Sequence, residues 1–537
     1  MLTGTTSCVS DLDQYPHTET TSKDVYTSLA NYEAVLGKIY AAMVTSGQGK
    51  GGDNKDMESV LNNGSGFDYM RMFINMQECG TDEFASTWLT GEQTTGLTYL
   101  SWDANDAWVS DMYYRIYYNI ALCNEFLRNA NSASFSGADA EKMKEYKAEV
   151  RFMRALFYYH ALDFYRNIPM VTENDPVGSY IPPRYTPQQT FDYIESELKD
   201  CVGDMLPAST CPYGQASQGA AYTLLAKLYL NSEVYTGVAK YAECKEACKK
   251  VMDMGYSLES DYSKLFNADN DKRTNEIIFA LPVSAEHTVS WGSSTYLVCG
   301  QVSMSNANQN VADYGVTAGW SEFRLRPEFV DKFTQTDIDG GGDKRCKFFT
   351  NGQSKDVTSM TDETTGYLSE KWSNLKDDGT TASNTADAGV ETDYPLFRLA
   401  DVYLMYAECV ARLGEDWDNW DGGSDAEAAT RKEGAIYYIN KVRERAYGDA
   451  EHNVWKDNFA SDADFLQFIL DERARELYHE GYRRTDLIRF GEFTTNKYIW
   501  QWKGGTHDGQ AVDSKYNIYP IPNTELTANP NLHNDNY

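Results

Sequence analysis

Helical periodicity of apolar residues recurs along most of this chain and restricts its fold more than any other feature. Apolar residues spaced three and four apart predict amphipathic helices. Such helices are expected at about 24–45, 105–131, 139–166, 187–204, 215–233, 238–254, 396–414, 431–446 and 463–489. Strand patterns are scarce, and "NEIIFALPV" (275–283) is a short strand-like run. We therefore expect an all-α fold in which long loops and minor β-hairpins carry any ligand site.

The aromatic stretch "AEVRFMRALFYYHALDFYRNIPMV" (148–171) tests whether the rings build a core or bind a ligand. Its apolar residues follow helical spacing, with small alanines between them, and Pro169 disfavours helix in the residue before it. Segments 219–237 and 397–415 share this mixture of Ala, Leu and Tyr. Paired helices of this composition are typical of tetratricopeptide units, here with an irregular period. The aromatic helix is therefore predicted to be core.

The charge balance limits the classes of partner. The chain has 537 residues, 48 of them basic and 80 acidic, which gives a net charge of −32. Nucleic-acid binding needs clustered Lys and Arg, so the charge balance argues against that class. A neutral ligand such as a sugar is compatible with this surface. The 39 Tyr and 11 Trp supply flat apolar faces with polar edges, which suit wet binding surfaces as well as helical cores.

Signals for catalysis or metal binding are weak. A glycoside hydrolase needs two carboxylates about 5–9.5 Å apart, and the sequence marks no such pair. Gly-x-Ser-x-Gly, phosphate-loop and His-Glu-x-x-His motifs are missing, and "DERARE" (471–476) is typical of a charged helix with internal ion pairs. Asp269 and Asp271 leave a structural calcium open, although Thr274 replaces the glycine of an EF-hand loop. We expect no cofactor and no catalytic metal.

Cys8 stands just ahead of a polar segment near the start of the sequence. A free thiol on a disordered arm and a lipoprotein cysteine are equally compatible with its position. No apolar run reaches the length of a membrane-spanning helix.

Four segments, in order, resemble signatures of the SusD/RagB family. They are the helix at 148–171, "PLFRLADVYLMYAECVARLGE" (395–415), "ILDERARELYHEGYRRTDLIRFGEFT" (469–494) and the closing "YPIPNTELTANPNLHNDNY" (519–537). Together they extend over nearly the whole chain. Shorter segments, "GSSTYLVCG", "GWSEF" and "FGEFTTNKYIWQWKGG", resemble the starch-binding member of that family.

The resemblance implies an organisation and a location. It implies a tether at 1–22, an N-terminal helical region at 23–260 and a C-terminal region at 261–537, which form one composite globular domain. It further implies an outer-membrane lipoprotein of Bacteroidetes, anchored through lipid on Cys8 and facing the exterior. The expected partners are malto-oligosaccharides or starch and a SusC-like TonB-dependent transporter. The expected function is glycan capture without catalysis.

The resemblance also assigns binding residues. Family rings that hold the glucan correspond to Trp88, Tyr296 and Trp320, and a family arginine that contacts sugar hydroxyls corresponds to Arg71. Pyranose C–H faces pack on aromatic rings, so an arc of rings can select the curvature of an α-1,4 glucan. The alternative is that each ring only packs in the core, and Tyr296 in particular could face inward from a strand.

Two positions depart from the family pattern. Gly91 stands where the family has an asparagine, and Ser86 stands where a second ring would precede Trp88. Affinity or preferred glucan length is expected to differ as a result. Rival interpretations are a receptor for a different glycan, an extracellular hydrolase whose nearest acids are Asp82, Glu83 and Glu92, and a purely structural lid on the transporter.

Overall fold

Long helices packed side by side form most of the protein. A computed structural model describes residues 22–47, 49, 56–57, 60–61, 67–384, 389–417 and 434–537. The longer helices are α2 (Leu29–Ala41), α3 (Tyr69–Glu78), α5 (Ala107–Ser132), α6 (Ala138–Tyr165), α7 (Pro187–Cys201), α8 (Gln218–Leu230), α10 (Tyr241–Met252), α11 (Ser293–Gly300), α14 (Leu399–Arg412), α16 (Ala435–Tyr447) and α17 (Asp462–Leu477). None of the described helices is both long and apolar enough to cross a membrane.

The remaining α-helices are short, and the strands form antiparallel pairs. The short α-helices are α1 (Ser22–Val25), α4 (Thr95–Tyr99), α9 (Ser232–Thr236), α12 (Pro327–Val330), α13 (Gln335–Ile338), α18 (Arg483–Arg489) and α19 (Asn523–Ala528). The strands pair antiparallel as β1 (Ala85–Ser86) with β5 (Phe323–Arg324), β2 (Ile168–Pro169) with β3 (Arg184–Tyr185), β4 (Ile277–Leu281) with β8 (Tyr394–Arg398), and β6 (Phe348–Phe349) with β7 (Leu368–Ser369). The predicted all-α class with minor β-hairpins is confirmed, and β4 falls within the predicted strand.

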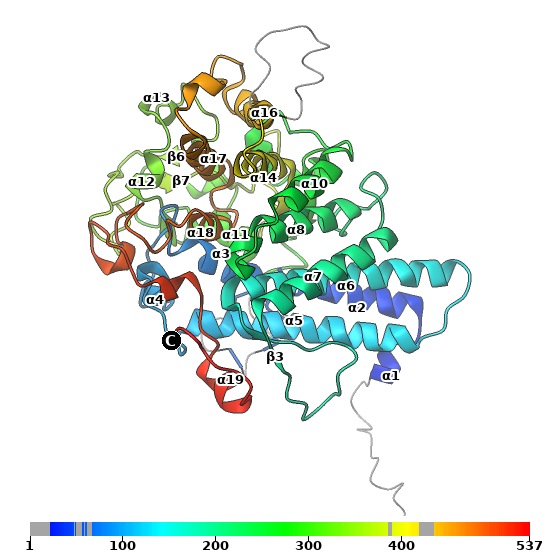
Figure 1. Ribbon diagram of the computed structural model, residues 1–537. Coiled ribbons are helices and arrows are strands. Elements are labelled where there is room, and N and C mark those ends of the chain that lie inside the picture. The colour runs from blue at the N-terminus through cyan, green and yellow to red at the C-terminus, as the bar shows by residue number, and fades with distance from the viewer. Residues whose placement is uncertain are drawn as a thin grey trace, which may run out of the picture.

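The helices form a continuous array. Figure 1 shows α5, α6 and α7 lying side by side, with α8 and α10 next to them and α14, α16 and α17 beyond. The loops, short strands and C-terminal segments occupy the other side of the molecule. Because α10 packs against α14, the regions predicted at 23–260 and 261–537 share a core. The domain boundaries themselves stay predictions.

Side-chain caps explain several helix starts. Ser28 accepts the backbone N–H of Asn31 at the start of α2, so this helix is shorter than the predicted 24–45. Asp106 caps α5 in the same way. At α7, Thr186 and Gln189 form a capping box ahead of Pro187. The aromatic helix α6 is buried along its C-terminal half, which confirms that its rings are core.

The predicted single helix at 463–489 is wrong. The chain leaves helical geometry between α17 and α18, where His479 and Gly481 have φ values of 58° and 81°. A Cβ at Gly481 would lie 2.4 Å from Cε1 of Phe73, so only glycine fits there. Apolar periodicity continues across this break, and the periodicity alone could not locate it.

Buried ion pairs tie the C-terminal helices to the rest of the chain. Arg398 at the end of β8 pairs with Glu476 of α17 at 2.6 Å and with Glu480 at 2.6 Å. Arg345 pairs with Glu472 of α17 at 2.6 Å. The "DERARE" run contains the predicted internal pair, between Arg475 and Glu472 at 2.7 Å, and its glutamates are also buried against arginines from distant segments.

Candidate functional site

A short β ladder brings two distant tryptophans together. In the β1–β5 pair, Ser86 lies opposite Phe323. The ladder continues where the N–H of Thr87 donates to the oxygen of Glu322 at 2.9 Å. The indole N–H of Trp88 then donates to the backbone oxygen of Trp320 at 2.9 Å. The structure thus joins Trp88 and Trp320, which were both predicted as site residues.

Indole rings are accessible around this junction. Trp88 keeps 38% of its surface exposed, while Trp320 is partly buried. Trp291, just before α11, keeps 43% exposed, and its backbone oxygen accepts the Arg71 guanidinium at 2.8 Å. Sequence reasoning missed Trp291. The signal was an apolar ring in the polar segment "SWGSS", directly ahead of a helix.

Gly91 and Ser86, the two departures from the family pattern, lie on either side of Trp88. The N–H of Glu92 donates to the oxygen of Trp88 at 3.0 Å, which closes the turn. A Cβ at Gly91 would lie 3.4 Å from Cε3 of Trp88, an ordinary contact distance. Ser86 is buried, and its hydroxyl lies 2.9 Å from that of Thr94. Ser86 therefore belongs to the ladder and offers no ring surface.

Arg71 lies beneath the rings. It is buried on the first turn of α3, where its Nη2 donates to the carboxylates of Glu92 at 2.5 Å and Glu322 at 3.1 Å. Its Cζ lies 4.1 Å from the ring centroid of Tyr296. A guanidinium held in this way supports the loops that carry Trp88, Trp291 and Trp320. Direct contact of Arg71 with sugar hydroxyls stays a prediction, and its burial argues for an indirect role.

The charges beneath the rings perturb one another. Burial alone would lower the pKa of Arg71, but the Glu322 and Glu92 carboxylates raise it. Burial raises the pKa of Glu322 to about 8, although Arg71 opposes that shift. One guanidinium thus faces two carboxyl groups.

Tyr296 is a core residue in this structure, which corrects its sequence-based placement on an exposed arc. Only 2% of its surface is exposed. Its hydroxyl donates to Oδ1 of Asn75 at 2.7 Å, and its ring packs against Phe84 and Phe323. The segment is the helix α11, every residue of which is buried, rather than a strand or a loop. The ring has no face free for a sugar.

The starts of α3 and α11 are locked by one carboxylate. Oδ1 of Asp68 accepts the N–H of Arg71 at 2.8 Å and that of Ser293 at 3.1 Å. A Cβ at Gly292 would lie 2.1 Å from this oxygen, so the residue after Trp291 must be glycine. This contact fixes Trp291 relative to Arg71.

The loop before Trp88 is supported from the C-terminal region. Arg483 of α18 forms two hydrogen bonds with the carboxylate of Asp82, at 2.7 and 2.8 Å. Burial would raise the pKa of Asp82, but Arg483 lowers it to about 2. The ring of His479 lies 2.9 Å from the backbone oxygen of Glu83. Asp82 and Glu83 are therefore buried structural acids.

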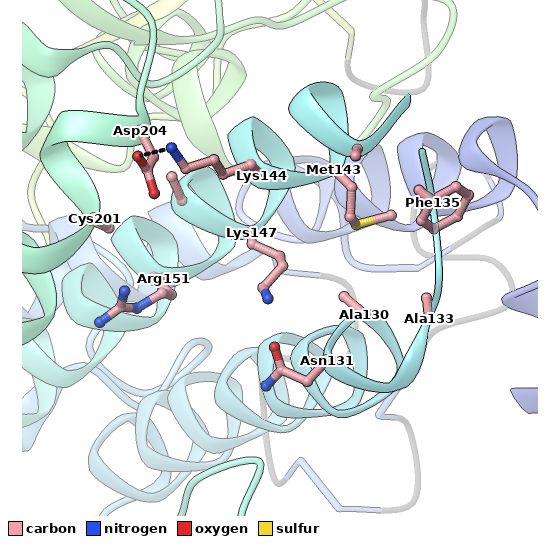
Figure 2. A pocket seen from close by; sticks show the side chains of 12 residues that line it. Ala130, Asn131, Ala133, Phe135, Met143, Lys144, Lys147, Arg151, Cys201 and Asp204 are labelled. Atoms are coloured by element: carbon pink, nitrogen blue, oxygen red, sulfur yellow. Dashed lines mark ion pairs between the residues drawn. The ribbon is translucent and has the colours of Figure 1, made fainter. Parts of the chain in front are cut away.

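Two sizeable cavities lie away from the tryptophans. One of about 460 Å³ lies among α5, α6 and α7, where Lys144 pairs with Asp204 at 2.7 Å (Figure 2). Figure 2 shows the side chain of Lys147 directed into the space between α6 and α5. Phe135 is the one aromatic residue that lines it. A second, of about 320 Å³, lies beside α2. Neither cavity is lined by an indole ring.

The acidic residues around the rings are engaged in pairs, as far as the described residues show. The carboxylates of Glu92 and Glu322, on the segments that carry Trp88 and Trp320, both bind Arg71. Within the residues that the structure describes, no set of three or more His, Cys, Asp or Glu side chains could hold a metal ion. Cys8 and residues 1–21 of the expected tether lie outside the described residues.

Family models match both ends of the chain. A model described as the SusD family matches residues 346–537. A second, described as "Starch-binding associating with outer membrane", matches residues 12–230.

Individual relatives cover almost the whole length. The starch-binding protein SusD of Bacteroides thetaiotaomicron is 33% identical over 574 aligned positions, which include 98% of this chain and 95% of that protein. A SusD-like carbohydrate-binding protein of Bacteroides fragilis has a TM-score of 0.72 at 18% identity, covering 95% of this chain and 100% of that one. Surface glycan-binding protein A of Bacteroides thetaiotaomicron, in complex with laminarihexaose, has a TM-score of 0.68 at 16% identity, covering 95% and 99%.

Proposed function

Because this chain belongs to the SusD family, we propose that it captures starch and malto-oligosaccharides on a surface formed by Trp88 and Trp320. The observation that carries the proposal is the hydrogen bond that ties the partly exposed ring of Trp88 to the backbone of Trp320, whose own ring is also partly exposed. The 33% identity over nearly the full length to a starch-binding protein supports an α-1,4 glucan as the ligand.

The chemistry of the rings suits a sugar. Pyranose C–H faces pack on indole rings, and the indole edge leaves polar groups in contact with water. Trp291 extends the aromatic surface on the side of α11. Arg71 supports the surface from beneath, and Glu92 supplies carboxylate oxygens at its edge. Tyr296 contributes to the core below rather than to the surface.

We propose binding without cleavage. Glycoside hydrolysis needs one carboxyl group that donates a proton and a second that acts as nucleophile or base. Glu92 and Glu322 share the guanidinium of Arg71, which supports a structural role for both. Release of reducing sugar from starch by the purified protein, lost in Glu92→Gln, would make the hydrolase interpretation the correct one.

A different glycan is the second candidate. One structural neighbour is bound to laminarihexaose and another is described as laminarin binding, at identities of 16% and 20%. Gly91 and Ser86, where the starch-binding pattern has an amide and a ring, favour testing this possibility. A purely structural lid would bind none of the glycans.

We further propose a cell-surface location with lipid on Cys8 and a SusC-like TonB-dependent transporter as partner. The family model described as associating with the outer membrane supports the location. The test uses a precursor with a lipoprotein signal segment ahead of Cys8, expressed without the transporter. Cys8→Ala is expected to move the protein out of the membrane fraction. Retention of that variant would require another anchor.

The experiment that tests the ligand is a side-by-side binding series. Purified protein is measured against starch, pullulan, laminarin, levan and cellulose by affinity electrophoresis, and against maltoheptaose by calorimetry. Binding to starch and maltoheptaose is expected, with none to cellulose. Binding to laminarin alone would establish the second candidate, and no binding at all would favour the lid.

A matched pair of variants tests the surface. Trp88→Ala is expected to weaken maltoheptaose binding by at least about tenfold, since stacking on an aromatic side chain is worth about 1–3 kcal/mol in nucleic-acid complexes. Trp455→Ala is the control, because Trp455 is 40% exposed but lies between α16 and α17. Equal affinities of the two variants would contradict the proposed surface.

A further inference from the structure

One carboxylate gathers three serine hydroxyls beside Trp320. Oε2 of Glu363 accepts hydrogen bonds from the hydroxyl groups of Ser303 at 3.0 Å, Ser305 at 2.9 Å and Ser321 at 2.5 Å. These four residues are called the serine clasp below. Two of the serines lie on the loop after α11, and the third directly follows Trp320. The clasp therefore joins the loop to the turn that carries the ring.

Neutral groups donate the hydrogen bonds to the clasp carboxylate. Within the described residues Glu363 forms no ion pair, so neutral hydroxyls carry its hydrogen bonds. These hydrogen bonds outweigh partial burial and lower the pKa of Glu363. Hydrogen bonds to an ionised acceptor are shorter and stronger than neutral ones. The carboxylate thus holds two segments in a fixed relation.

The position of Glu363 is itself set by the strand that follows Trp320. Arg324 of β5 donates through Nη1 to the backbone oxygens of Asp362 and Thr365, each at 2.6 Å. These carbonyls flank Glu363 on both sides. The same short segment therefore carries the ring at Trp320, the clasp hydroxyl at Ser321 and the arginine that orders the Glu363 loop.

The turn at Trp320 needs this support. Ser321 has a φ of 51°, in the left-handed region that non-glycine residues rarely adopt. The N–H of Trp320 donates to the backbone oxygen of Cys299 at 2.9 Å, and the N–H of Ser321 donates to the backbone oxygen of Val302 at 2.9 Å. A strained residue persists where its surroundings determine its conformation. The serine clasp and these two backbone hydrogen bonds hold Ser321 in this conformation.

Met304 lies on the loop that the clasp holds. Its backbone N–H donates to Oγ of Ser321 at 2.7 Å, which places it next to the Trp320 turn. Its side chain is 55% exposed, although a methionine gains free energy by covering apolar surface. A thioether is flexible and polarizable, and it adapts to irregular apolar faces.

We propose that Met304 makes a further apolar contact with the bound glucan beside Trp320, and that Glu363 is the positioning residue that holds both in place. The proposal rests on the proposed function and extends it by one glucose unit along the chain. Met304 would cover the C–H face of that unit. Ligands long enough to reach it would gain affinity over ligands that span the rings alone.

The first test compares Met304 variants on ligands of two lengths. Met304→Ala is expected to weaken maltoheptaose binding by about five- to tenfold, as the loss of a side-chain contact predicts, with a smaller effect on maltotriose. Met304→Leu keeps the volume and should stay within about twofold. Val238→Ala is the control, because Val238 is equally exposed on the far helical region. A Met304→Ala protein with unchanged maltoheptaose affinity overturns the contact.

The second test measures coupling between the clasp and Met304. Glu363→Ala is expected to weaken maltoheptaose binding by at least about fivefold, and adding Met304→Ala should then cost less than about twofold more. If the affinity losses of the two single variants multiply in the double variant, Glu363 does not act through Met304. Glu363→Gln keeps the side-chain volume and one acceptor oxygen. It replaces Glu363→Ala in this test if Glu363→Ala lowers the melting temperature. Its expected loss is about two- to fivefold, and wild-type affinity for Glu363→Gln overturns the positioning role.

The two levels of the proposal fail in different ways. If the wild-type protein binds no maltoheptaose, or Trp88→Ala binds as tightly as wild type, the proposed function fails. If wild type binds and Trp88→Ala weakens while the Met304 and Glu363 variants match wild type, only the further inference fails. Glu233→Ala is the control for Glu363, since its carboxylate also accepts a hydroxyl, from Tyr241.

Discussion

The indole N–H of Trp88 and the backbone oxygen of Trp320 form a hydrogen bond of 2.9 Å across 232 positions of sequence. This bond ties the Trp88 indole to the backbone of the Trp320 turn. The turn at Trp320 is in turn joined to the loop after α11. The aromatic surface is therefore preformed, so a ligand need not order it at the moment of binding, and affinity benefits from that preorganisation.

Trp320→Ala should remove most binding to maltoheptaose and leave the fold intact. The ring is only partly buried, so its truncation should destabilise the protein by less than the roughly 3–5 kcal/mol typical of a core tryptophan. Calorimetry of binding and of thermal unfolding on the same variant separates the two roles. A sharply lower melting temperature, or unchanged affinity, would return Trp320 to the core.

Tyr296→Phe should lower stability without changing affinity. The variant loses the hydrogen bond of 2.7 Å to Asn75, which is worth about 0.5–1.5 kcal/mol, and keeps the buried ring. Urea unfolding and maltoheptaose titration measure the two effects. A tenfold loss of affinity at unchanged stability would restore the sequence-based role of Tyr296 in the site.

Gly91→Asn should strengthen glucan binding. The Cβ would lie at contact distance from the ring of Trp88, and the backbone there is outside the left-handed region, so the side chain is tolerated. An added amide could form one hydrogen bond to a sugar hydroxyl, worth about two- to tenfold in affinity. Gly91→Ala is the control that separates the Cβ from the amide. Equal affinities of the two variants would show that the amide adds nothing.

Glu149→Gln should flatten the dependence of stability on pH. Burial raises the pKa of Glu149 to about 7, partly opposed by a hydrogen bond of 2.7 Å from the hydroxyl of Tyr40. The folded state holds this proton more tightly than the unfolded chain, whose Glu pKa is about 4.3. The contribution of this proton to the free energy of unfolding is therefore fully present below about pH 4.3 and is lost as the pH rises through about 7.

The measurement is the free energy of unfolding at about pH 5 and about pH 7.5. Wild type is expected to lose about 1–3 kcal/mol more than Glu149→Gln over that interval, because glutamine still accepts from Tyr40 and has no proton to lose. Parallel pH profiles would show that Glu149 does not titrate in this range.

Apolar periodicity predicted long helices such as α7 and α10, which bury one face and expose the other. It failed for α3, where every residue from Tyr69 to Glu78 is buried and no polar face remains to mark the period. It also extended across the break at Gly481, because that break depends on the contact with Phe73. Both failures have a tertiary cause that no local pattern contains.

The site was predictable only in part. Trp88 and Trp320 stand in polar segments, and the structure brings them together. Arg71 and Tyr296 were assigned to direct sugar contact, yet both are buried. The burial of Arg71 could not be predicted, because it depends on carboxylates such as that of Glu322, which are distant in sequence. Trp291 was missed because a single ring ahead of a helix does not reveal which way it faces.

The pairing of Asp82 with Arg483 has a consequence for the order in which the protein can mature. The two residues are 401 positions apart, and Asp82 stands six residues before Trp88. A ribosome delivers the chain from its N-terminus, so the loop that leads to the first ring waits for its counter-charge until residue 483 has been made. A chain that stops before Arg483 would leave the Asp82 carboxylate without that partner. The loop that carries Trp88 therefore depends on one of the last helices of the sequence to be synthesised.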